Sequence, residues 1–286
     1  MQKTKFRNTI FLLLTAVIWG TAFVAQSVGM DYIGPFTFNA ARFLIGGTVL
    51  LPLIWYRSKR VPKIREKSLK KITLAGGVCC GAALCSASLF QQIGIQYTTV
   101  GKAGFITTLY IIIVPVIGLL FGRSVPGKVW VGAVMAVFGL YLLCVNESFT
   151  IGRGDWLVLI CAVLFSIHIL VIDYFSPKVD GVVLSSIQFY VSGIISTIGA
   201  LWKETPDILQ MLDAAAPILY AGVMSCGVAY TLQVIGQKNM NPTIASLILS
   251  LESVISVLAG WLILGQALSL KEIFGCVIVF AAVILV

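Results

Sequence analysis

The first apolar run of the chain reads IFLLLTAVIWGTAFVAQSV and occupies residues 10–28. It contains no charged residue, and a helix of about 20 apolar residues is long enough to cross the roughly 30 Å hydrocarbon core of a bilayer. Basic residues precede the run, but no small-residue cleavage site follows it, so it is not typical of a signal peptide. The run therefore predicts a first membrane-spanning helix.

Runs of the same kind recur along the whole chain, separated by Gly and Pro residues that favour turns. Only 11% of the residues are charged and 59% are hydrophobic, whereas a soluble domain carries roughly 25% charged residues. We therefore predict an all-α membrane protein of ten transmembrane helices. They are expected near residues 9–28, 35–55, 70–93, 101–121, 127–145, 155–174, 182–202, 214–236, 242–264 and 270–286.

The net charge of +9 does not indicate a nucleic-acid partner, because of where the basic residues lie. Eight of the 20 Lys and Arg residues fall within residues 57–71, and three more precede the first apolar run. Basic clusters that border membrane helices mark the cytoplasmic side. We predict a multi-pass protein of the cell (plasma) membrane with both termini in the cytoplasm.

The seven cysteines all lie in apolar segments, and no Cys-x-x-Cys occurs. This pattern is typical neither of a disulfide framework nor of a zinc site. We expect no metal and no cofactor.

The two halves of the chain can be aligned with each other. A shift of 146 places residues 16–19 on 162–165, and a shift of 142 places residues 91–94 on 233–236. We predict two repeats, residues 1–147 and 148–286. Five helices per repeat is an odd number, so the repeats must be inverted relative to each other. Many secondary transporters have this architecture, with the substrate site near the midplane between the repeats and alternating access to it.

Several short motifs keep a characteristic order along the chain: Trp19-Gly20, Ala41-Arg42-Phe43, Gln91-x-x-Gly94, Pro115 through Gly122, and Leu251-Glu252 through Gly265. With these motifs the whole chain resembles the EamA-type members of the drug/metabolite transporter (DMT) superfamily. It departs from their pattern at helix ends, at Ser253, Arg123 and Gln266. The resemblance implies two five-helix EamA domains and efflux of small compounds, such as amino acids and their metabolites, often by proton- or gradient-linked exchange.

An ionisable residue in the hydrocarbon costs about 2.5–3.5 kcal/mol to insert, and three stand out well inside the expected helices: Arg42, His168 and Glu252. Arg42, which shares a helix face with Asn39, could anchor an anionic group of a substrate or tie helices together. Glu252 could carry a proton or bind a substrate amine, or it could hold helices together. His168 could relay protons or donate a hydrogen bond between helices.

Uncharged polar and aromatic residues in the repeat-matched regions complete the candidate substrate site. Each could contact substrate or only pack within the bundle. They are Trp19, Gln91, Gln92, Tyr110, Gln188, Tyr230 and Gln233.

These observations favour a secondary transporter, with a small-molecule substrate and the lipid bilayer as partners and protons as a candidate coupling ion. An integral-membrane enzyme acting on lipid is one alternative, but it requires a cluster of catalytic groups near one interface, and the chain has a single histidine. A non-transporting membrane scaffold is the other alternative, and it requires no internal polar groups. We predict a transporter and not an enzyme.

Overall fold

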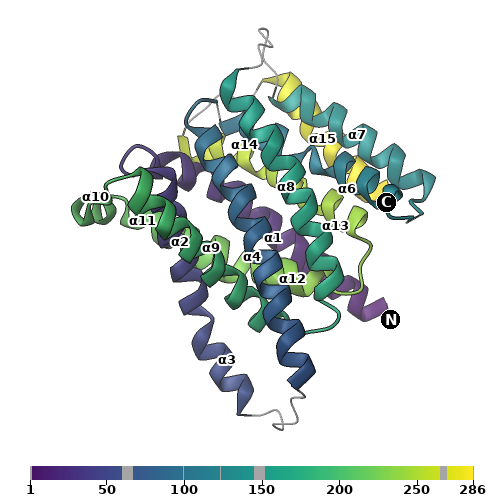
Figure 1. The fold of residues 1–286 in the computed structure, drawn as a ribbon. Helices are drawn as coiled ribbons and strands as arrows, with labels where there is room; N and C mark the ends of the chain where they lie inside the picture. Colours follow the sequence, from purple (N-terminus) through teal and green to yellow (C-terminus); the bar gives the residue numbers. More distant parts are fainter. Residues whose placement is uncertain are drawn as a thin grey trace.

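The computed structural model describes residues 2–59, 67–98, 100–122, 124–144, 152–264 and 269–285. All regular secondary structure in these ranges is helical, which confirms the all-α prediction (Figure 1). The predicted repeat boundary at residues 147 and 148 lies outside the described ranges, as do residues 60–66 of the basic loop, Arg123 and Gln266.

The first half of the chain forms seven helices: α1 (Gln2–Gly29), α2 (Pro35–Val49), α3 (Leu51–Ser58), α4 (Lys67–Ile95), α5 (Val100–Thr108), α6 (Tyr110–Leu120) and α7 (Gly127–Cys144). The second half forms α8 (Arg153–Phe175), α9 (Gly181–Lys203), α10 (Ile208–Asp213), α11 (Ala215–Leu219), the π-helix η1 (Tyr220–Tyr230), α12 (Thr231–Gln237), α13 (Pro242–Leu249), α14 (Leu251–Leu264) and α15 (Leu270–Leu285).

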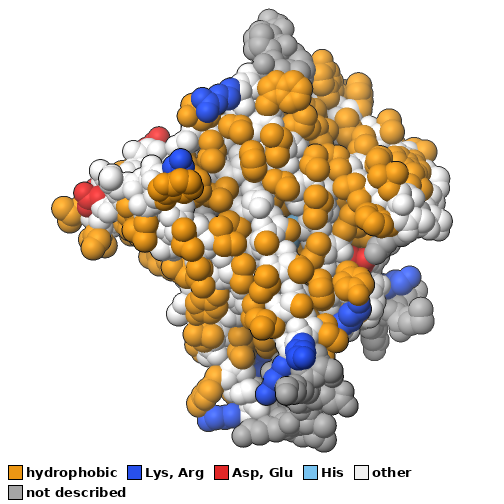
Figure 2. All heavy atoms as spheres, viewed as in Figure 1, with side chains coloured by type: hydrophobic (Ala, Val, Ile, Leu, Met, Phe, Trp, Pro, Cys, Tyr) orange, Lys and Arg blue, Asp and Glu red, His pale blue; other side chains and the backbone are white. Residues whose placement is uncertain are grey.

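Eight helical segments of the described chain are long and apolar enough to cross a membrane: Lys5–Gly29, Pro35–Ser58, Leu69–Ile95, Lys102–Leu120, Arg153–Phe175, Gly181–Lys203, Ala215–Gln237 and Pro242–Ala259. Gly127–Leu142 is a shorter apolar helix. Hydrophobic side chains cover the middle of the molecule in Figure 2, and Lys and Arg gather at its lower end, around α3 and the start of α4. The chain is a multi-pass membrane protein.

Two expected helices are kinked near their middles, which the apolar pattern did not indicate. Residues 101–121 form α5 and α6, and residues 242–264 form α13 and α14. At the two kinks a hydroxyl bonds back to a backbone carbonyl: Thr108 Oγ1 to Gly104 O at 2.9 Å, and Ser250 Oγ to Leu247 O at 2.7 Å. Bonds of this kind bend helices. Thr108 and Ser250 are equivalent at the shift of 142, so the kinks are equivalent too.

The start of α2 is capped from the other half of the chain. Glu204, which follows α9, accepts hydrogen bonds from Phe36 N at 2.9 Å, Thr37 N at 2.8 Å and Thr37 Oγ1 at 2.6 Å. The N-cap residue of α2 is Gly34, which has no side chain to satisfy these donors. Glu204 therefore links α9 to α2.

We expect Glu204→Ala to destabilise the protein by about 1–3 kcal/mol, because it leaves the first amides of α2 without their acceptor. The midpoint of thermal unfolding in detergent micelles measures the effect. Asp207→Ala is the matched control, because Asp207 lies in the same loop and caps only the short α10, through Leu209 N at 2.8 Å. Equal shifts of the midpoint in the two variants would contradict the link between α9 and α2.

Candidate central binding site

A hollow lies in the middle of the helix bundle and encloses about 450 Å³ of empty space, measured out to its mouth. The part of it that the centre of a water molecule can occupy is about 30 Å³, room for about one or two waters. Its walls come from helices of both halves. The lining residues are Trp19, Phe23, Gln26, Arg42, Gln91, Thr107, Tyr110, Phe165, Ile169, Ser225, Tyr230, Gln233, Leu249 and Glu252.

The structure brings most of the predicted site residues together at this hollow. Those that line it are Trp19, Arg42, Gln91, Tyr110, Tyr230, Gln233 and Glu252. The other four predicted residues are buried nearby but are not part of its wall: Asn39, Gln92, His168 and Gln188. Their roles in substrate binding or proton coupling stay predictions.

Arg42 supplies the positive charge of the hollow. Its side chain is 2% exposed, its Nη1 donates to Gln26 Oε1 at 2.8 Å, and its guanidinium carbon lies 4.8 Å from the centre of the Phe43 ring. Within the described chain, Nε and Nη2 have no acceptor. These two nitrogens form one edge of the guanidinium, the edge that binds a carboxylate with two parallel hydrogen bonds. The arrangement can therefore bind an anionic group.

Glu252 supplies the negative charge. It is 4% exposed and lies in the first turn of α14, where Tyr110 Oη donates to its Oε1 at 2.9 Å. Helix α1 approaches α14 closely here, because a Cβ at Gly20 would lie 2.6 Å from the Glu252 carbonyl oxygen. Gly20 thus lets α1 and α14 pack closely beside the hollow.

An aromatic group forms another wall, with a polar layer behind it. The ring centres of Trp19 and Tyr230 are 4.5 Å apart. His168 packs against the Tyr230 ring from behind, at 6.1 Å between centres, and its Nε2 lies 3.1 Å from Gln188 Oε1. His168 and Gln188 thus support Tyr230 from outside the hollow.

Two other predicted residues also lie behind the wall. Gln92 Nε2 donates to the Gln26 carbonyl oxygen at 3.1 Å, which holds α4 to α1. Both amide atoms of Asn39 are buried without a hydrogen-bond partner in the described chain.

Gln26, the residue that orients Arg42, was not among the predicted site residues. A signal was present, because residues 19, 23 and 26 are spaced to share one helix face, and all three line the hollow. Thr107 was also missed; its Oγ1 accepts a hydrogen bond from Gln91 Nε2 at 3.2 Å.

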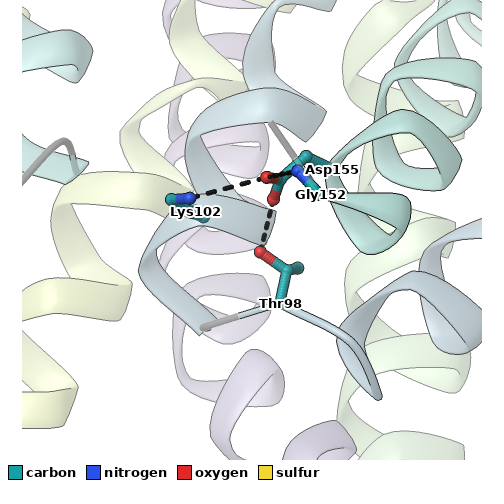
Figure 3. Close-up of polar contacts among 4 residues, drawn as sticks. All are labelled: Thr98, Lys102, Gly152 and Asp155. Carbon is teal, nitrogen blue, oxygen red and sulfur yellow. Dashed lines mark hydrogen bonds and ion pairs between the residues drawn. The ribbon is translucent and has the colours of Figure 1, made fainter. Parts of the chain in front are cut away.

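At one end of the bundle, a buried carboxylate joins α8 to the segment that connects α4 and α5 (Figure 3). Asp155 accepts hydrogen bonds from Thr98 Oγ1 at 2.5 Å and from Gly152 N at 2.9 Å, and Lys102 Nζ lies 3.5 Å from its Oδ2. These contacts hold the start of α8 against the start of α5.

At the other end, a second hollow of about 1,030 Å³ lies between α6, α8 and α13. Val114 and Asp173 line it, and each lies four residues beyond a residue of the central hollow, Tyr110 and Ile169 respectively. Residues four apart on a helix share a face. The second hollow therefore lies along the same faces of α6 and α8, one turn further on.

Comparisons with known proteins show which family the chain belongs to. A family model described as the EamA-like transporter family matches residues 7–145 and 152–286. A protein of Archaeoglobus fulgidus named an uncharacterized transporter is 31% identical, over 96% of this chain and 84% of its own length. The inner membrane transporter YedA of Escherichia coli, named as uncharacterized, is 22% identical over 94% of this chain and 87% of its own length.

The fold also has a counterpart among solved structures. One crystal structure superposes with a TM-score of 0.78 at 20% sequence identity, covering 97% of this chain and 95% of the other. The match to the family model takes in both halves of the chain and most of its residues. The chain belongs to the EamA-like transporter family.

Proposed function

We propose that this transporter is a secondary exporter of small polar metabolites such as amino acids. Ten membrane-spanning helices form two inverted repeats, residues 1–147 and 148–286, with both termini in the cytoplasm. The substrate binds in the central hollow between the repeats. Access to the hollow alternates between the two sides of the membrane.

The observation that carries the proposal is that equivalent positions of the two repeats line the central hollow. Ten of its fourteen lining residues form five such pairs: Trp19 with Phe165, Phe23 with Ile169, Gln91 with Gln233, Thr107 with Leu249, and Tyr110 with Glu252. The last pair is in direct contact through the Tyr110–Glu252 hydrogen bond. A two-fold axis relating the repeats would therefore pass between these two side chains, through the hollow.

The packing of helices supports the same symmetry. Helix α2 packs on α9, and α7 packs on α15, so each helix contacts its own counterpart. The contact of α4 with α8 is matched by the contact of α1 with η1 and α12. Likewise, the contact of α4 with α9 is matched by that of α2 with η1.

The two ends of the bundle differ in a way that favours alternating access. The hollow between α6, α8 and α13 lies one helical turn beyond the central site, toward the end that we assign to the cytoplasm. By the equivalence of the repeats, α6 corresponds to α14, α8 to α1 and α13 to α5. At the opposite end of the bundle, next to these counterparts, Asp155 joins α8 to α5. We infer a cytoplasm-facing state. Exchange of the two repeat conformations would open the other end.

The polar groups of the hollow suit a zwitterionic substrate. The unpaired edge of Arg42 matches a carboxylate, and Glu252 matches an ammonium group. Uncharged hydrogen-bonding groups come from Gln91 and Gln233, and the aromatic wall offers apolar surface for a side chain. An amino acid carries all of these features.

Counterflow in proteoliposomes tests the proposal. Vesicles that contain the purified protein are loaded with an unlabelled amino-acid mixture, and radiolabelled amino acids are added outside, one at a time. We expect at least one label to accumulate above the level in protein-free vesicles. Chemical conversion of the label would favour a membrane enzyme, and the absence of both flux and binding would favour a scaffold.

The direction of transport has its own test. Cells that overproduce the protein should tolerate a toxic analogue of the transported amino acid better than cells without it, because export lowers the internal concentration of the analogue. Greater sensitivity of these cells would contradict export.

A further inference from the structure

A basic cavity lies at the end of the molecule where α1 begins and where α8 and α12 end. It encloses about 640 Å³ of empty space, measured out to its mouth. Arg7, Arg57 and Lys238 line it from three different segments, and Asp180 is the single acid in its lining. The cavity therefore carries an excess of positive charge.

The acid of this cavity is already engaged. Asp180 Oδ1 accepts hydrogen bonds from Val182 N at 2.9 Å and Val183 N at 3.2 Å as the N-cap of α9, and its Oδ2 lies 3.2 Å from Arg57 Nη2. Arg7 and Lys238 form no ion pair with any other described residue. Two cations are thus left to face an anionic ligand.

A buried hydroxyl points to the same ligand independently of these charges. Ser176 lines the cavity and is 1% exposed, and its Oγ has no hydrogen-bond partner in the described chain. A buried hydroxyl without a partner costs about 1–3 kcal/mol. A phosphate oxygen would accept a hydrogen bond from the Ser176 hydroxyl and offset that cost.

Much of the remaining lining is apolar and lies within membrane-spanning helices. Phe11 belongs to the span Lys5–Gly29, and Val234 and Ile235 belong to the span Ala215–Gln237. The cavity thus has cations at the helix ends and apolar side chains deeper in the bilayer. This arrangement matches a phospholipid, whose phosphate lies at the interface and whose acyl chains lie in the hydrocarbon.

We propose that this cavity binds the phosphate headgroup of an anionic phospholipid. It is separate from the central hollow, with which it shares no lining residue. Neighbouring residues of α12 line the two sites: Gln233 the hollow, and Val234 and Ile235 the cavity. The lipid would contact α1, α3, α9 and α12, and so link helices of both halves at the basic end of the molecule.

Native mass spectrometry of the delipidated full-length protein tests this proposal, with phosphatidylglycerol and phosphatidylcholine as probes. We expect one phosphatidylglycerol to be retained in preference to phosphatidylcholine. Arg7→Gln and Lys238→Gln should each weaken its binding about fivefold, since one cation near the membrane surface contributes about that factor. Ser176→Ala should also weaken it about fivefold, by loss of one hydrogen bond and without change of charge.

Two controls make the test decisive. Lys70→Gln removes an exposed cation of α4 that does not line the cavity, so it should leave binding unchanged. Equal weakening by Lys70→Gln, or unchanged binding in Ser176→Ala, would overturn the proposal. Displacement of the lipid by equimolar inorganic phosphate would also overturn it, and would assign the cavity to a soluble anion. Unchanged elution on size exclusion verifies that each variant is folded.

Discussion

Replacement of Arg42 by glutamine is expected to reduce kcat/KM for amino-acid counterflow about 30-fold or more. Loss of one partner from a buried, hydrogen-bonded charge pair costs about 2–5 kcal/mol, and in our proposal the substrate carboxylate is that partner. Arg42→Lys should recover part of the activity, because it restores the charge but not the two-nitrogen edge. Radiolabelled counterflow in proteoliposomes gives kcat/KM for the original protein, Arg42→Gln and Arg42→Lys.

The matched control for Arg42 is Arg153→Gln, which removes an arginine at the exposed start of α8. It should transport like the original protein. A substrate analogue without the carboxylate, the corresponding amine, sharpens the test. Arg42→Gln should lose its preference for the amino acid over the amine. A variant that loses transport of both compounds in the same proportion would show that Arg42 does not bind the carboxylate.

Replacement of Glu252 by glutamine is expected to separate exchange from proton-driven accumulation. The amide of the new side chain would keep an oxygen to accept the Tyr110 hydrogen bond, but it cannot bind and release a proton. We expect counterflow, which requires no net proton movement, to persist with a raised KM, because the amide oxygen can still accept a hydrogen bond from the substrate ammonium group but no longer carries a charge. Accumulation driven by a pH gradient should fall at least about tenfold. Parallel measurements of the two modes in one proteoliposome preparation give the result.

The control for Glu252 is Glu272→Gln, because Glu272 is a partly exposed acid at the start of α15, where it bonds the nearby Ser269. It should keep both modes of transport. If Glu252→Gln still accumulates substrate along a pH gradient, Glu252 is not the proton carrier. Loss of both modes would show that substrate binding requires the charge of Glu252 and that exchange cannot proceed without it.

Eight of the ten expected spans coincide with helices that are long and apolar enough to cross a membrane, because the bilayer fixes the length and polarity of a spanning helix. The residues around the hollow could be predicted in part, because a polar group costs free energy in hydrocarbon wherever it lies. Which of two adjacent glutamines lines the hollow could not be predicted. Gln91 faces it and Gln92 faces the Gln26 carbonyl, because neighbouring residues point about 100° apart around a helix, and the rotation of α4 is set by its packing partners.

Contacts between segments far apart in the sequence were the other part that could not be predicted. Asp155 has the pattern of an ordinary first-turn acid, and its burial depends on Thr98 and Lys102 of a segment more than 50 residues earlier. Gln188 occupies the position equivalent to Arg42, yet it pairs with His168 behind the aromatic wall. Equivalence between the repeats predicts how deep in the membrane a residue lies, but it does not predict which residue its side chain contacts.

The Tyr110–Glu252 hydrogen bond has a consequence for the transport cycle. Because Tyr110 and Glu252 are equivalent positions, exchange of the two repeat conformations leaves this contact in place. The hydrogen bond can therefore persist through the transport cycle while other contacts between the repeats change. Arg42 has no such counterpart, because the equivalent residue is a neutral glutamine. In our proposal the outward-facing and inward-facing forms are therefore chemically unlike, and the substrate should bind with different affinity on the two sides of the membrane.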